Sequence, residues 1–152
     1  MILNRQRRVK VPVEPLRDFL NEVRTEIGLP AWALTICMVS DHAMQRLNRG
    51  FRGKDRPTDV LSFPAKRQRR PLPIAGNKRQ RGGTLPVGFL GDVAISPEMA
   101  RRNARHHGRS LSKELRILIL HGILHLMGYD HETDGGQMNH LEGRLRRRLG
   151  LS

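Results

Sequence analysis

The feature that most constrains this chain is a string of three histidines that follows an apolar run. His121 and His125 are four residues apart, and His131 follows six residues after the second. The preceding residues 115–120 are apolar apart from Arg116, which predicts a buried helix because nearly every face must be covered. Residues four apart lie on the same face of a helix, so the first two imidazoles are expected to converge on one metal ion.

A glycine after the predicted helix supplies the turn that brings in the third imidazole. Gly128 can adopt the left-handed conformation that ends many helices, so the chain can turn back and present His131. Three imidazoles with a fourth position open to water suit a catalytic zinc site, with Zn–N distances of about 2.0–2.1 Å. A structural zinc site usually includes cysteine among four ligands, and this chain has one cysteine. The pattern therefore predicts one catalytic zinc ion (Zn2+) per chain.

The histidine spacing also matches the metzincin protease pattern H-E-x-x-H-x-x-G-x-x-H, except at its second position. Metzincins carry there the glutamate that acts as general base, whereas this chain has Gly122. The motif therefore indicates a metal hydrolase, and a metallopeptidase is a less favoured alternative.

Length and charge narrow the class of partner. The 152 residues favour one domain, and 28 basic against 14 acidic residues give a net charge of +14. Such a charge favours RNA or another nucleic acid, or an anionic membrane surface. No apolar run approaches the roughly 18 residues of a spanning helix, and the N-terminal residues lack the apolar core of a signal peptide. Cys37 is expected to be a small buried residue in a reducing compartment, so we expect a cytoplasmic protein without a membrane partner.

Apolar periodicity and capping residues predict alternating strands and helices. Strands are expected within residues 2–13, 32–39, 60–64 and 85–95, and the second of them is expected to have both faces covered. Helices are expected to begin at Pro15, at Asp41 and after Ser96. The buried helix is expected to be capped by Ser110 or Ser112, and a last amphipathic helix is expected over 137–149.

A segment at residues 66–83 has no acidic residue and is rich in arginine and lysine. Its prolines and glycines predict a mobile basic insert. A solvated loop is the simpler interpretation, and an RNA-binding arm that contacts phosphates is the favoured one. Its basic residues are Lys66, Arg67, Arg69, Arg70, Lys78, Arg79 and Arg81. Because the chain has few aromatic residues, we expect RNA binding to depend on phosphate contacts and to weaken with salt.

Three motifs together resemble the YbeY-type rRNA maturation factors, which are bacterial zinc-dependent endoribonucleases. They are HGILHLMGYDH at 121–131, TDVLSFP at 58–64 and LGDVAIS at 90–96. Their order and approximate separations match as well, so the resemblance covers nearly the whole chain. It implies a single α+β domain over 1–152, in which helices pack with a mixed four-stranded sheet. The three-histidine metal site would then lie on a buried helix and the turn after it.

The resemblance also implies functional roles. His121, His125 and His131 would bind zinc, and Arg52 in the FRGKD run would be the active-site arginine. The implied activity is cleavage of single-stranded RNA, in maturing the 3′ end of small-subunit rRNA and in ribosome quality control. Partners would be rRNA precursors and ribosomal particles, without specificity for DNA. A ribosome-assembly factor with a structural zinc and little catalysis stays open as an alternative, and so does the oligomeric state.

Other polar residues receive provisional roles. The guanidinium fork of Arg52 matches phosphate oxygens, so this side chain, which would also contact RNA, is expected to stabilise charge during cleavage. Asp130 and Asp92 are candidates for orienting a ligand or moving a proton, although Asp92 is equally a candidate turn residue. The remaining histidines, at positions 42, 106, 107 and 140, are expected at the surface, although His140 on the last helix is also a candidate spare ligand.

Overall fold

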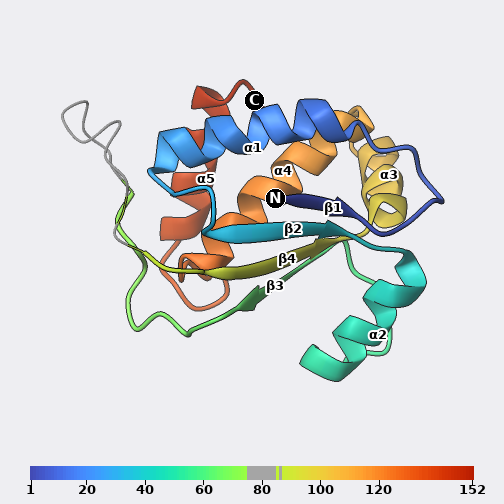
Figure 1. The fold of residues 1–152 in the computed structure, drawn as a ribbon, viewed down its shortest axis with the longest axis horizontal. Helices are drawn as coiled ribbons and strands as arrows, with labels where there is room; N and C mark the ends of the chain where they lie inside the picture. Colours follow the sequence, from blue (N-terminus) through green and yellow to red (C-terminus); the bar gives the residue numbers. More distant parts are fainter. Residues whose placement is uncertain (75–84, 86) are drawn as a thin grey trace.

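The computed structural model describes residues 1–74, 85 and 87–152. Within these residues, four strands form one sheet and five helices pack around it (Figure 1). The elements are β1 (Ile2–Asn4), α1 (Val13–Ile27), β2 (Leu34–Met38), α2 (Asp41–Arg52), β3 (Val60–Pro64), β4 (Gly91–Ile95), α3 (Pro97–His106), α4 (Leu111–Leu126) and α5 (Gln137–Arg148).

The sheet is mixed, with strand order β1-β2-β4-β3. β1 and β2 are parallel, β2 and β4 are parallel, and β3 runs antiparallel to β4. Among the described strands, β3 therefore lies at an edge of the sheet and pairs only with β4. The predicted α+β fold with a mixed four-stranded sheet is confirmed.

Helices cover the two faces of the sheet unequally. α1, α4 and α5 lie together on one side of the sheet, whereas α2 lies on the other side at one end (Figure 1). Val93 of β4 points towards α4, because its methyl groups lie where a side chain on Gly122 would stand. The adjacent Ala94 points the other way and packs with Leu61 and with Met44 of α2.

The central helix of the fold is α4, which carries the first two histidines. Most of its residues from Leu115 onward are buried, as the apolar run predicts for a helix covered on nearly every face. Ser110 is the N-cap, and its hydroxyl accepts a hydrogen bond from the Lys113 N–H at 3.1 Å. Of the two serines that the sequence offered as caps, the structure selects Ser110.

Two predicted strands are shorter than expected. β1 ends at Asn4, because the Gln6 side chain then bonds both the N–H and the carbonyl of Val9 and holds the chain in a loop. β4 begins only at Gly91, whose φ of 144° falls in a region that favours glycine. A Cβ there would lie 2.2 Å from the Phe63 carbonyl oxygen, so β3 and β4 approach closely because this residue has no side chain.

Helix starts and one burial prediction also differ from expectation. α1 begins at Val13, so Pro15 lies inside the first turn and not at its start. Ser40 caps α2, while Asp41 accepts a hydrogen bond from the Ser96 hydroxyl at 2.6 Å. β2 is buried on alternate residues only, since Thr35 and Cys37 are partly exposed. None of the helices in the described ranges has the length and apolar character needed to cross a membrane.

Candidate metal centre

The three histidines come together at the C-terminal end of α4. His121 and His125 lie on its last turns, and the helix ends at Leu126. Gly128 then adopts a φ of 96°, which reverses the chain and brings His131 back towards the helix. A Cβ on Gly128 would lie 2.9 Å from Cβ of Gln68, so the turn is also closely packed. The predicted turn and the predicted meeting of the three rings are both present.

The imidazole nitrogens are spaced as ligands of one ion would be. One nitrogen from each of the three rings lies within 4.8 Å of the other two. The Nε2 atoms of His121 and His125 are 3.1 Å apart, so they face each other across the site. Neighbouring ligands of a tetrahedral zinc with Zn–N bonds of about 2.0–2.1 Å lie about 3.3 Å apart. These donors therefore fit a metal ion with an open fourth position.

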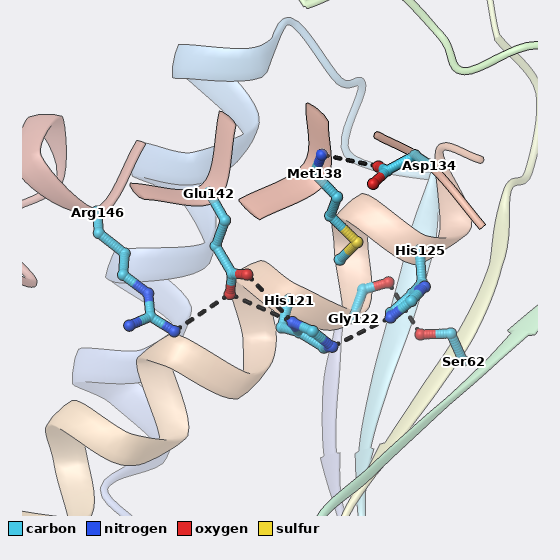
Figure 2. Close-up of polar contacts among 8 residues, drawn as sticks. All are labelled: Ser62, His121, Gly122, His125, Asp134, Met138, Glu142 and Arg146. Carbon is cyan, nitrogen blue, oxygen red and sulfur yellow. Dashed lines mark hydrogen bonds and ion pairs between the residues drawn. The ribbon is translucent and has the colours of Figure 1, made fainter. Parts of the chain in front are cut away.

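A carboxylate from α5 holds the first histidine in place. Glu142 is buried, and both of its carboxylate oxygens lie 3.3 Å from Nδ1 of His121 (Figure 2). Arg146 donates a hydrogen bond to the same carboxylate at 3.3 Å. With its Nδ1–H bonded to Glu142, His121 has Nε2 free to face a metal. The chain of contacts runs from Arg146 through Glu142 and His121 to His125.

The charge state of Glu142 follows from these contacts. Burial by itself raises the pKa of this carboxyl, but the hydrogen bond and charge of His121, together with Arg146, lower the pKa on balance. Glu142 is thus held as a carboxylate. We did not predict this residue from the sequence, although it borders the apolar stripe of α5 formed by Met138, Leu141 and Leu145. The position of an acidic residue beside this apolar stripe was the signal in the sequence that could have indicated a buried carboxylate.

The second histidine is held as a neutral ring. Burial lowers the pKa of His125, and the neighbouring His121 and His131 lower it further, whereas Asp130 acts in the opposite direction. A metal binds the neutral imidazole, so the environment favours the form that acts as a ligand.

The histidines open into a cavity of about 620 Å³ that also contains Arg52. Arg52 is exposed on the last turn of α2, and no ion pair with another described residue engages it. Residues of the edge strand β3 and Arg67 also line this cavity, as does Asp130. A neighbouring cavity of about 330 Å³ shares Arg52, and Lys54 and Arg56 contribute to it. Basic side chains thus extend from the metal centre around the end of α2.

The other predicted site residues lie elsewhere. Asp92 is exposed on β4 and alternates with Val93, so it is on the face of the sheet away from α4 and does not line the cavity. Of the basic segment, Lys66, Arg69 and Arg70 are exposed outside the cavity lining, and Lys78, Arg79 and Arg81 fall outside the described residues. The four histidines expected at the surface are exposed: His42, His106, His107 and His140.

Close packing explains the glycine at the position of the metzincin glutamate. A Cβ on Gly122 would lie 2.5 Å from Cγ1 of Val93, so α4 approaches the sheet too closely for a larger residue. The Ser62 hydroxyl donates a hydrogen bond to the Gly122 carbonyl at 2.9 Å, which ties α4 to β3 at the same point (Figure 2). The protease general base therefore has no room here.

Comparisons with known proteins give the same family over nearly the whole chain. The family model described as endoribonuclease YbeY matches residues 1–150. A Koribacter versatilis protein named endoribonuclease YbeY is 40% identical over 151 residues, covering 99% of this chain and 86% of that protein. An Aquifex aeolicus protein of the same name is 37% identical over 134 residues, covering 88% and 79%. The solution structure of a Thermotoga maritima protein superposes with a TM-score of 0.61 at 30% identity, covering 98% of this chain and 89% of that one.

Proposed function

This chain belongs to the endoribonuclease YbeY family, and we propose that it is a zinc-dependent endoribonuclease that cleaves single-stranded RNA. The observation that carries the proposal is the convergence of three imidazoles in one cavity with Arg52, an arginine that forms no ion pair with any residue in the described part of the chain. A set of three neutral nitrogen donors suits zinc, and a guanidinium suits a phosphate. The YbeY relatives are named as endoribonucleases, which supports RNA as the substrate.

The proposal assigns a role to the three histidines, to Arg52 and Asp130, and to Glu142 behind the cavity. Zinc, when bound, supplies a Lewis acid and lowers the pKa of water. His121, His125 and His131 hold the ion, and Glu142 keeps His121 oriented. Arg52 binds the scissile phosphate and stabilises the charge that develops on its oxygens. Asp130, beside the histidines, accepts a hydrogen bond from the Glu132 N–H at 3.0 Å and so orders the loop that carries His131.

The biological substrate follows from the family and the charge. We propose that the chain acts in the cytoplasm on rRNA precursors and ribosomal particles, in maturing the 3′ end of small-subunit rRNA and in ribosome quality control. A net charge of +14 suits a partner that presents many phosphates.

The test combines metal content with RNA cleavage. Wild type should contain about one zinc per chain by mass spectrometry, and it should cleave a single-stranded RNA. His125→Ala should fold but lose both the metal and the cleavage, whereas His140→Ala, an exposed histidine outside the cavity, should keep both. Zinc-loaded wild type that leaves single-stranded and precursor rRNA intact would contradict the proposal.

The contacts that Glu142 and Arg146 make behind His121 favour a second candidate function, in which the metal is structural. The Arg146–Glu142–His121 chain joins α5 to α4, as a structural ion site would. A ribosome-assembly factor with a structural zinc predicts that His121→Ala unfolds, whereas a catalytic site predicts a folded, inactive variant. A circular dichroism melt of that variant, measured beside its RNA cleavage, separates the two. A peptidase is disfavoured by the close packing at Gly122.

A further inference from the structure

An exposed aromatic ring stands at the edge of the cavity. Phe51 is on the last turn of α2, directly before Arg52, and both residues line the cavity that holds the histidines. Its side chain is 56% exposed, although aromatic rings usually contribute to cores by burial. Packing against the described residues therefore leaves more than half of this ring exposed beside the three histidines.

The ring is supported from one side. Its centroid lies 4.6 Å from that of Phe63 on β3, with the two planes tilted by 60°. Phe63 in turn packs against the small cluster that contains Leu61 and Met44. Phe51 is thus held by a neighbour that the sheet and α2 anchor, and most of its surface stays available. A ring held in place gives up little rotamer freedom when a flat partner binds to it.

The surroundings select the partner. Arg52 and Arg67 line the same cavity as Phe51, and the exposed Lys54 and Arg56 line the neighbouring cavity that shares Arg52, so cationic groups lie on the surface near the ring. Cations near an exposed aromatic ring are the combination that binds single-stranded nucleic acid, in which phosphates meet the charges and unpaired bases stack on the ring. A partner protein would meet one exposed ring at the end of α2 among basic side chains, which offers little apolar area to bury.

We propose that Phe51 is a stacking platform for one nucleobase of single-stranded RNA, adjacent to the phosphate held by Arg52. This inference rests on the proposed endoribonuclease function and adds a base subsite to it. Because every base has a flat face, the subsite favours unpaired over paired RNA without selecting a sequence. The base subsite also sets the position of the RNA along the cavity, because a base stacked on Phe51 places its own phosphate group near Arg52.

The test compares variants that keep the ring with variants that keep only apolar bulk. Phe51→Leu should bind a single-stranded RNA oligonucleotide at least about fivefold more weakly, the lower end of the effect of losing one stacked base. Phe51→Tyr, which keeps the ring, should stay within about twofold of wild type. Phe89→Leu, at another exposed aromatic outside the cavity lining, is the matched control and should not change affinity. Binding is measured by fluorescence anisotropy in EDTA, and kcat/KM of the zinc-loaded proteins should follow the same order.

Abasic substitutions along the oligonucleotide locate the base. One abasic position should weaken wild-type binding but leave Phe51→Leu unchanged, because the variant has already lost that contact. Equal affinity of Phe51→Leu and wild type would overturn the inference. Equal weakening by the Leu and Tyr variants, accompanied by a lower melting temperature, would also overturn it, since Phe51 would then only support the fold. If wild type itself neither binds nor cleaves RNA, the proposed function fails together with this subsite.

Discussion

At the scale of single residues, the contact between Glu142 and His121 gives the first prediction. Its carboxylate accepts from Nδ1 of His121, and partners of this kind orient a metal-binding imidazole. We expect Glu142→Gln to lower zinc affinity about 10- to 100-fold, measured by competition with a chromophoric chelator. The matched control is Glu132→Gln, which removes the same charge from an exposed side chain that lines the cavity of the histidines. An equal loss in both variants would show that only the overall charge of the cavity matters.

The glycine in the middle of the histidine motif gives a second prediction at this scale. In an exposed helix interior, Gly→Ala stabilises a protein by about 0.5–1 kcal/mol. At Gly122 the added Cβ would lie 2.5 Å from Val93, so we expect overpacking to dominate and Gly122→Ala to destabilise the protein by about 1–3 kcal/mol. Chemical denaturation measures this change in the free energy of unfolding.

Two variants test the cause of that loss. Gly50→Ala, in α2 with no atom within 4 Å of the new Cβ, should be neutral or stabilising. In a Val93→Ala background, Gly122→Ala should lose much of its effect, because the clashing methyl groups are gone. Strictly additive losses in the double variant would mean that Val93 is not the obstacle.

At the scale of elements, the N-cap of α4 determines how the helix that carries the histidines begins. Ser110→Ala removes the hydroxyl that accepts from the Lys113 N–H, so we expect a loss of about 0.5–2 kcal/mol in unfolding free energy. Ser112→Ala, two residues further along the same helix, should change it by less than about 0.5 kcal/mol. Thermal melts of the metal-free proteins provide the comparison, and a larger effect at Ser112 would place the cap there.

Elements whose signals are local were predicted well. α3 follows Ser96 and begins at Pro97 as expected, since the Ser96 hydroxyl accepts a hydrogen bond from the Met99 N–H at 3.2 Å and proline suits the first helical position. α4 was predicted because a continuous apolar run requires burial on every side. The lengths of β1 and β4 were not predicted, because the Gln6 side chain and the close approach of Phe63 to Gly91 decide them through contacts outside the strand itself.

In the candidate site, too, the residues with local signals were predicted and those placed by a second element were not. His121, His125 and His131 meet through helix periodicity and one glycine turn, so eleven consecutive residues contain the whole arrangement. Glu142 reaches the site only because α5 packs against α4, since it lies 21 positions after His121 in the sequence. Phe51 stands at the cavity because α2 ends beside β3, which no pattern within α2 reveals. Chemistry held within one helix and its turn is visible in a sequence, whereas support from a second element is not.

At the scale of the whole molecule, the proposed function requires the positive charge and the metal centre to act on one substrate. Arg67 and Arg52 line the cavity that holds the histidines, and the neighbouring cavity, which shares Arg52, is lined by Lys54 and Arg56; we treat the two cavities as one groove for the RNA strand. If phosphates of a bound strand occupy this path, the affinity for RNA depends on salt through the counterions that they release. A high net charge spread evenly over the surface would give salt dependence as well, so the position of the charges has to be tested.

Two triple variants separate position from net charge. Lys54→Ala/Arg56→Ala/Arg67→Ala removes three cations from the path, and Arg7→Ala/Arg8→Ala/Lys10→Ala removes three exposed cations from the loop between β1 and α1. For single strands, log K against log[salt] has a slope of about −0.7 per phosphate contact. We expect the first variant to make the slope shallower by up to about 2 and the second to leave it nearly unchanged. Equal changes in both would mean that RNA is held by the overall charge, and that the groove selects only where it is cut.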